Sequence, residues 1–420
     1  TGATGASAAT GGTQTGVTPT TIKVGIALVD FSCIKDFVDS VRVDEDKVYS
    51  AFIDDLNAKG GINGRTIVPV YEKYCPLGSA APLAVCTKLT DDDKVFAVIG
   101  TFVDFSGDAQ TCVAKQHKTV LMTFQLTQQI IDKSPQGLMI YPGATNERTA
   151  KVLIDLLSKT KRLKGKTVAV LGGSAEAGVV NQTIVPALKK KGVKLGSTAV
   201  LSINGTSDTS AAQAQLQSFI ERWKGEHVNS IFLSGDEVSS KDFVTEIRNA
   251  LPKVQLIVDN QDVRSPARDQ VQAGTKPNPY EGILSTSGPT PHEYDNSADW
   301  TYCSAIYKKQ LGKTPPNAEQ VVPGPGGKTL DTYGALNDSC QIITMFHDIA
   351  TKAGKKLTTA SWIKAVNSYG PIVNRGGGQF GSLHKGKYDI QDSFRLEAFD
   401  SSIAGGGDWK PLTPIEDVPG

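Results

Sequence analysis

The residue types that carry out catalysis are present in this sequence, but their spacing matches no catalytic motif. The sequence lacks a G-x-S-x-G nucleophile turn, a G-x-x-x-x-G-K-[ST] phosphate loop and a G-x-G-x-x-G dinucleotide fingerprint. Gly172, Gly173 and Gly178 come closest, and their spacing is more typical of a plain strand-to-helix turn. We therefore expect a non-enzymatic protein without a cofactor; the alternative is a doubly wound enzyme of an unrecognised class.

Side chains that bind metals are also present without the spacing of a metal site. The five histidines are scattered singly, with no pair at i, i+4, at His117, His227, His292, His347 and His384. Asp91, Asp92 and Asp93 are consecutive carboxylates, but the rest of a calcium loop is missing, which favours a solvated helix end. The sequence predicts no metal site.

Six cysteines are the remaining reactive side chains. None forms a C-x-x-C pair, and none has a histidine at zinc-finger spacing. An even number without metal spacing favours disulfides and an oxidising compartment, although the residues alone do not choose a pairing. The alternative is a cytosolic protein with six buried thiols.

Polar and aromatic side chains follow several apolar runs, where loops begin. Ligands of open α/β sheets bind at the carboxyl ends of strands, so these side chains are candidates for a polar ligand site. Taken singly, each is more typical of a solvated loop; their shared placement favours binding. The candidates are Phe31, Thr101, Phe102, Asp104, Phe124, Gln125 and Thr127 in the first half, and Glu176, Asp236, Glu237 and Gln261 in the second.

The elements that must position these residues alternate between strand and helix. Residues 22–29 form an apolar, β-branched run typical of a strand buried on both faces, and 41–59 carry apolar residues at helical spacing. A second strand at 66–71 completes a β-α-β unit. A second series of alternating elements begins after 141–143, so two runs of this kind predict two doubly wound sheets. In the last third we expect helices at 300–311 and 330–353 and a strand pair at 379–380 and 392–399.

Length and composition agree with two α/β domains. The chain has 420 residues, with 44 basic against 43 acidic side chains, so nucleic-acid binding has no electrostatic support. The first residue is Thr1, and residues 1–20 are rich in Gly, Ala, Thr and Ser, which predicts a flexible tether. Removal of a signal sequence would explain this start; truncation is the alternative.

Several segments resemble the type I periplasmic binding proteins of the branched-chain amino acid class. They are IKVGIALVD, DLNAKGGINGR, KLTDDDKVFAVIG, LKGKTVAVLGGSAEAGVV and YGALNDSCQIITMFHDIATKAG, of which DLNAKGGINGR is the most specific. The resemblance covers roughly residues 21–400. It implies two Rossmann-like lobes joined by a three-strand hinge, with lobe 1 at 21–141 plus 287–377 and lobe 2 at 142–286 plus 378–420. The predicted crossings lie near Tyr141, Ser285–Gly288 and Gly376–Gln379.

The resemblance also implies a function. Such proteins capture a small molecule between the lobes and deliver it to the permease of an ABC importer, whereas some members act as sensors instead. We therefore expect an extracytoplasmic monomer whose only membrane contact is an N-terminal lipid anchor. The carboxylate-binding hydroxyls of the family are replaced around Asp104, Thr127 survives, and Glu237 and Gln261 offer acceptors. This pattern favours a cationic or multiply hydroxylated solute.

On the implied fold, the cysteines fall into three neighbouring pairs. Cys33 and Cys75 follow adjacent strands, while Cys86 and Cys112 lie on consecutive helices, as do Cys303 and Cys340. The resemblance thus predicts disulfides Cys33–Cys75, Cys86–Cys112 and Cys303–Cys340.

Overall fold

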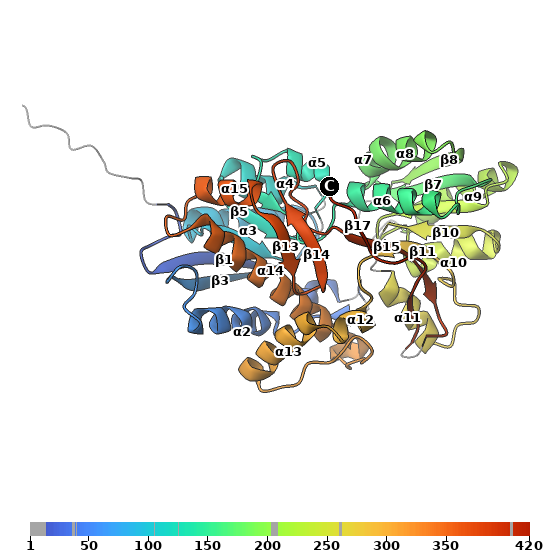
Figure 1. The fold of residues 1–420 in the computed structure, drawn as a ribbon. Coiled ribbons are helices and arrows are strands. Elements are labelled where there is room, and N and C mark those ends of the chain that lie inside the picture. Colours follow the sequence, from blue (N-terminus) through green and yellow to red (C-terminus); the bar gives the residue numbers. More distant parts are fainter. Residues whose placement is uncertain are drawn as a thin grey trace, which may run out of the picture.

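The computed structural model describes residues 14–35, 38, 40–104, 106–124, 126–202, 209–259, 263–403 and 406–420, which form two α/β lobes side by side (Figure 1). Residues 14–20, part of the predicted tether, pack against lobe 1. Lys23 N donates to Gly16 O at 2.7 Å, and Thr359 N donates to the Gln14 side chain at 2.9 Å. The first 13 residues of the predicted tether lie outside the described residues.

Lobe 1 is built on a five-stranded parallel sheet of order β3-β1-β4-β5-β6. Its strands are β1 (Thr21–Val29), β3 (Thr66–Tyr74), β4 (Ala97–Gly100), β5 (Val120–Thr123) and β6 (Met139–Ile140). The six residues of β1 from Val24 to Val29 are all buried, without the alternation of buried and exposed residues found in a half-exposed strand. This pattern arises because helices cover both faces of a parallel sheet.

Helices complete lobe 1. They are α1 (Phe31–Ile34), α2 (Glu45–Ala58), α3 (Ala80–Thr87), η1 (Lys88–Asp92), α4 (Asp108–Thr111), η2 (Cys112–Gln116), α5 (Gln128–Asp132), α13 (Ala298–Leu311), α14 (Thr332–Ala353) and α15 (Thr359–Asn367). Between α13 and α14 lie η4 (Pro325–Gly327) and β12 (Thr329–Leu330), which pairs with β2 (Ser40–Val41). The helix α2 ends before Gly60 and Gly61, whose φ angles of 102° and 59° suit glycine.

Lobe 2 is built on an eight-stranded mixed sheet. Seven strands follow the order β16-β15-β11-β10-β9-β7-β8, and the eighth, β17, pairs with β15. Its strands are β7 (Thr167–Gly173), β8 (Lys194–Leu201), β9 (Ser230–Ser234), β10 (Gln255–Val258), β11 (Leu284–Ser287), β15 (Ser393–Asp400), β16 (Asp408–Pro411) and β17 (Glu416–Asp417). Its helices are α6 (Asn146–Lys159), α7 (Ala177–Val179), η3 (Val180–Ile184), α8 (Val185–Lys190), α9 (Thr209–Gly225), α10 (Lys241–Ala250) and α11 (Arg264–Gln272). The short helix α12 (Pro291–Asp295) follows β11 and contacts α13 of lobe 1. The two sheets confirm the predicted α/β fold class.

The chain passes between the lobes three times. Each passage is seen where residues of one hydrophobic core are followed along the sequence by residues of the other core. Ile140 packs in the lobe 1 core and Ala144 in the lobe 2 core, close to the predicted crossing at Tyr141. The second change follows Leu284. The third comes between Ile390 and Phe394, later than the predicted 376–379.

The late third crossing is caused by a hairpin that the sequence pattern did not reveal. Strand β14 (Gln379–Leu383) pairs along its whole length with β13 (Gly370–Asn374), and of the predicted pairing with 392–399 only the start forms, where Asp392 N donates to Phe380 O at 3.1 Å. Its buried Leu383, together with Ile372 of β13, belongs to the lobe 1 core. The hairpin therefore keeps the chain in lobe 1 as far as Ile390, beyond the predicted crossing at 376–379.

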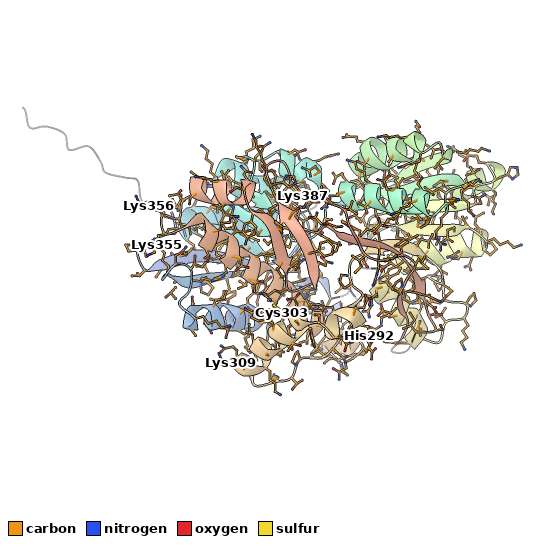
Figure 2. The ribbon with its side chains drawn as sticks, in the orientation of Figure 1. His292, Cys303, Lys309, Lys355, Lys356 and Lys387 are labelled. Carbon is orange, nitrogen blue, oxygen red and sulfur yellow. A yellow bond between two sulfur atoms is a disulfide. The ribbon has the colours of Figure 1, made fainter. Side chains whose placement is uncertain are left out.

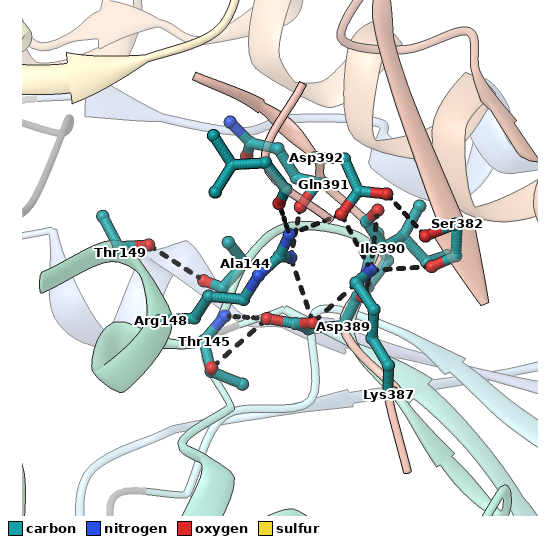
Figure 3. Close-up of polar contacts among 12 residues, drawn as sticks. Ala144, Thr145, Arg148, Thr149, Ser382, Lys387, Asp389, Ile390, Gln391 and Asp392 are labelled. Atoms are coloured by element: carbon teal, nitrogen blue, oxygen red, sulfur yellow. Dashed lines mark hydrogen bonds and ion pairs between the residues drawn. The ribbon is translucent and has the colours of Figure 1, made fainter. Parts of the chain in front are cut away.

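A buried ionic network joins the first and third crossings (Figure 3). Arg148 of α6 contacts Asp389 at 3.2 Å and also Asp392, while Lys387 contacts Asp392 at 3.2 Å. Thr145 N donates to the second Asp389 oxygen at 2.9 Å. All four charged side chains are almost fully buried, and Lys387 lies near the junction of the lobes (Figure 2). The network ties the start of α6 to the segment before β15.

The structure contains all three predicted disulfides, Cys33–Cys75, Cys86–Cys112 and Cys303–Cys340. The first follows the neighbouring strands β1 and β3, and the last joins α13 to α14. All three lie in lobe 1, so the covalent cross-links are concentrated there.

Replacing Cys303 and Cys340 by alanine should lower the free energy of unfolding by about 2–4 kcal/mol. The bond closes a loop of 37 residues, and its loss releases chain entropy in the unfolded state. Denaturant unfolding of the variant beside the wild type measures the change. Free thiols that titrate in the folded wild-type protein would contradict the pairing itself.

Candidate functional site

Three acidic side chains gather at the carboxyl edge of the lobe 2 sheet. Glu176 follows β7, Glu237 follows β9 and Asp259 follows β10, and these strands are neighbours in the sheet. Since the carboxyl ends of parallel strands meet at one edge, the three side chains are brought together from distant parts of the chain.

Two glycines leave room for the glutamates. A Cβ on residue 173 would lie 2.4 Å from Glu237 Oε2 and 3.0 Å from Glu176 Oε2. A Cβ on residue 235 would lie 2.5 Å from Glu176 Cδ. Any larger side chain at either position would displace a carboxylate, so these glycines are part of the site.

The environment of the two glutamates disfavours their charged forms. The Oε2 atom of each glutamate is buried and accepts no hydrogen bond from the described residues. Burial, with the neighbouring Glu237 carboxylate, raises the pKa of Glu176 to about 7, and burial raises the pKa of Glu237. A cation or a hydrogen-bond donor from a ligand would relieve both the repulsion and the missing hydrogen bonds.

Asp259 differs because the protein already satisfies it. Its carboxylate accepts hydrogen bonds from Ser234 Oγ at 2.6 Å and from Gly235 N at 3.2 Å. Burial raises its pKa to about 6. Asp259 thus holds the loop that carries the exposed Asp236 and the half-buried Glu237. The adjacent predicted residue Gln261 lies outside the described residues.

Buried acids should make the ligand-free protein less stable as the pH rises. The folded pKa values of Glu397 (about 8, raised by burial), Glu176 and Asp259 exceed their ordinary values, so the folded state binds protons more tightly between about pH 4.5 and 8. Their favourable contribution is complete below this window and is lost through it. We expect the free energy of unfolding to fall by more than about 2 kcal/mol from pH 6 to pH 9.

Chemical denaturation at a series of pH values measures this dependence. Glu397 is fully buried and accepts from Ser287 Oγ at 2.7 Å, so Glu397→Gln keeps the shape and removes the charge. That variant should show a shallower slope between pH 7 and pH 9. An unchanged slope would contradict the assignment to Glu397.

In lobe 1, two predicted ligand residues make contacts within the protein. Asp104 accepts hydrogen bonds from Ser106 N at 3.1 Å and Ala109 N at 2.8 Å, and thereby caps the start of α4. Phe102 is fully buried and packs edge-on against Tyr74 with ring centroids 5.7 Å apart. An aspartate after a strand often caps a helix, and a phenylalanine there often packs in the core. The sequence alone does not distinguish these roles from contact with a ligand.

The other predicted residues of lobe 1 remain at loop positions. The half-buried Phe31 begins α1, the half-buried Phe124 packs against the lobe 1 core, and Thr101 is half-buried after β4. Thr127 Oγ1 accepts from Ile130 N at 3.2 Å as the N-cap of α5. Gln125 lies outside the described residues.

Phe31 lines a pocket of about 360 Å³ at the carboxyl end of β1. Both apolar and charged side chains line the pocket. Its residues are Leu28, Val29, Asp30, Phe31, Ser32, Lys35, Val41, Arg42, Val43, Asp44, Glu45, Lys73 and Pro325. Arg42 is held by Glu45, Asp331 and Asp338 at 2.7–3.0 Å, so this guanidinium is already paired.

The carboxyl edges of the two sheets face each other. Gln129 Nε2, in the helix after β5, donates to Gln182 Oε1 of lobe 2 at 3.3 Å. A Cβ on Gly178 would lie 2.2 Å from the Gln129 side chain, so glycine permits this approach. Glu147 accepts from Gln128 N at 2.8 Å and reinforces the same contact. Sequence reasoning missed these residues, because nothing in their spacing marks a contact between lobes.

Two further features bear on the class of protein. Cys86, Cys112 and His117 have ligand atoms within 4.8 Å of one another, but both cysteines are joined in a disulfide and do not offer thiolates to a metal. Among the described residues, no helix combines the length and apolar character needed to cross a membrane.

Comparison with known proteins gives the family. A family model described as periplasmic binding protein matches residues 44–323. A search of curated protein sequences found no significant match. The fold is similar to that of an ABC transporter solute-binding protein from Rhodopseudomonas palustris BisB5, in complex with 3,4-dihydroxybenzoic acid. That comparison has a TM-score of 0.65 and 16% identity, and covers 95% of this chain and 98% of the other.

Two more solved structures are similar over nearly their whole length. A fatty acid ABC transporter substrate-binding protein from Thermomonospora curvata has a TM-score of 0.66 and 16% identity, covering 96% of this chain and 94% of the other. A leucine binding protein from Thermotoga maritima MSB8 has a TM-score of 0.65 and 13% identity, covering 94% and 99%. These likenesses establish the fold, and the family match spans more than half of the chain. The chain therefore belongs to the periplasmic binding protein family.

Proposed function

We propose that this protein is the extracytoplasmic solute-binding component of an ABC importer. In this proposal it captures a small polar molecule with a cationic group, such as an amino acid or a related amine, in the cleft between its lobes. Hinge closure retains the solute, and the permease receives it. Family membership supports the binding role, and the facing carboxyl edges of the two sheets support the position of the cleft.

The observation that carries the proposal is the pair Glu176 and Glu237. Two half-buried carboxylates without hydrogen-bond partners on Oε2 are costly unless a ligand supplies positive charge. Burial and, second to it, repulsion by Glu237 raise the pKa of Glu176, and a cation between the two groups would offset both effects. An anionic ligand at the same point would add to the repulsion.

The pocket beside Phe31 supports a second feature of the solute. Its lining comes from lobe 1 alone, and the apolar members Leu28, Val29 and Phe31 would suit a hydrocarbon or aromatic portion of an amine whose cationic group lies at the lobe 2 edge. The solved relatives named above bind a dihydroxybenzoate or carry the names of fatty acid and leucine binding proteins. A ligand with a carboxylate and no cationic group, such as a dihydroxybenzoate or a fatty acid, does not match the acidic lobe 2 edge proposed here, whereas an amino acid carries an ammonium group.

A ligand screen followed by calorimetry tests the proposal. Purified protein is melted with aliphatic and aromatic amines, polyamines, amino acids, sugars, hydroxybenzoates and fatty acids. We expect the amine-bearing compounds alone to raise the melting temperature, since ligand at 100 times its dissociation constant stabilises the folded state by about 2.7 kcal/mol. Preferential binding of hydroxybenzoates or fatty acids would refute the cationic solute, and transport assays with the cognate permease would separate import from sensing.

A further inference from the structure

A second charged surface lies at the opposite edge of the lobe 2 sheet. Between residues 159 and 194 the sequence has nine basic side chains and one acidic one, Glu176, although the whole chain is nearly neutral. The basic residues are Lys159, Lys161, Arg162, Lys164, Lys166, Lys189, Lys190, Lys191 and Lys194. We call these nine residues the basic surface.

Two turns bring the basic surface together. Residues 159–166 connect α6 to β7 and residues 189–194 connect α8 to β8, and β7 pairs with β8 so that Thr167 lies opposite Lys194. These elements lie together in lobe 2 (Figure 1). The turns border a shallow depression of about 500 Å³ that contains Lys161, Lys164 and Lys166 from one turn and Lys191 and Lys194 from the other.

The charge of the basic surface is largely uncompensated. Lys159 pairs with Glu416 and Lys191 pairs with Asp155, each at 2.6 Å. The other seven side chains form no ion pair with any residue that the structure describes, and all of them except the half-buried Lys166 are exposed. Holding so many like charges on adjacent turns is unfavourable without an anionic partner.

The basic surface is also distinct from the cleft. It lies at the amino ends of β7 and β8, whereas Glu176 and Glu237 lie at the carboxyl ends of β7 and β9. A partner on the basic surface would therefore leave the acidic site open to solute. The large exposed apolar side chains among the described residues (Val43, Val68, Leu77, Val321, Val373, Phe380) all lie elsewhere in the sequence.

We propose that the basic surface docks lobe 2 electrostatically on an anionic lipid bilayer. Lysine ammonium groups act as mobile point charges, which suit a diffuse field of lipid phosphates better than bidentate recognition of one group. The two turns expose no large apolar side chain, because Leu163 is buried and Val193 is half-buried, which indicates contact with headgroups without insertion into the acyl region. An extracytoplasmic protein that serves a membrane transporter would thereby stay near the bilayer with its cleft accessible.

Sedimentation with lipid vesicles tests the proposal. Vesicles of phosphatidylcholine alone are compared with vesicles containing about one third phosphatidylglycerol, at low and high salt. We expect binding only to the anionic vesicles, with loss of binding as salt rises, because the Debye length shrinks from about 10 Å at 0.1 M to about 3 Å at 1 M. Replacing Lys161, Lys164, Lys190 and Lys194 by glutamine should reduce the partition coefficient at least about tenfold.

A matched control removes the same charge from lobe 1. Lys308, Lys313, Lys355 and Lys356 are exposed, and Lys355 and Lys356 lie at the end of lobe 1 away from lobe 2 (Figure 2). Their glutamine variant should bind vesicles like the wild type. The proposal is overturned if both variants lose binding equally, if phosphatidylcholine binds as well, or if soluble heparin binds while the anionic vesicles do not.

Discussion

Replacing Glu176 and Glu237 together by glutamine should weaken binding of the cationic solute by about 100-fold or more. Each hydrogen bond to a charged group contributes about 1.5–3 kcal/mol, so loss of two such contacts corresponds to at least two powers of ten in the dissociation constant. The expected effect on stability has the opposite sign. Because the glutamates are half-buried and repel each other, the ligand-free variant should be no less stable than the wild type at pH 8. Calorimetric titration and thermal melting measure the two quantities.

The control for this experiment removes two exposed carboxylates from the same lobe. Glu221→Gln combined with Glu281→Gln changes the net charge equally at two exposed positions on the amino side of the sheet, because Glu221 lies in the second half of α9 before β9 and Glu281 precedes β11. Its affinity should match that of the wild type. Equal loss in both variants would indicate a long-range effect of charge, and unchanged affinity in the glutamate variant would remove these residues from the site.

The second large effect concerns Arg148 in the buried network between the crossings. Arg148→Met should lower the free energy of unfolding by about 3–5 kcal/mol, because Asp389 and Asp392 stay buried without their principal counter-charge. Lys387 alone must then balance two carboxylates, and burial lowers the pKa of Lys387. Denaturant unfolding monitored by fluorescence and circular dichroism provides the measurement.

Two further variants separate charge from packing. Arg162 is exposed in the turn after α6, so Arg162→Met should change stability by less than about 0.5 kcal/mol. Adding Asp389→Asn and Asp392→Asn to Arg148→Met removes the stranded charges and should restore part of the loss. If the triple variant is less stable than the single one, the arginine acts through packing and the electrostatic explanation is wrong.

The sequence predicted the features that depend on local pattern. The run of apolar residues in β1 and the glycines after α2 are enough to predict a buried strand and a helix end. The disulfides followed from the fold that the family resemblance implied, since Cys33 and Cys75 come after strands that pair in parallel. Glu176 and Glu237 were candidates because each follows a strand of the same predicted sheet, and in the structure they lie together at its carboxyl edge.

The sequence could not predict features that depend on distant partners. The hydrogen bond from Ala109 N to the carboxylate of Asp104 depends on how the loop after β4 folds, which the sequence pattern does not give. The β13–β14 hairpin was missed because its exposed Val373 and Phe380 lie opposite each other and hide the usual alternation of inside and outside. The network around Arg148 joins residues about 240 positions apart, and no spacing rule reaches that far.

The order of strands in the lobe 2 sheet has a consequence for biosynthesis. Strand β15 pairs with β11 through residues such as Ser287 and Arg395, and its partners β16 and β17 come only at the end of the chain. Lobe 1 likewise needs α14, which follows most of lobe 2 in sequence. Lobe 1 therefore stays incomplete until α14 has emerged, and lobe 2 until β15, β16 and β17 have emerged. Such non-local pairing slows folding and leaves unpaired strands exposed, so the nascent chain should depend on chaperones until these elements are available.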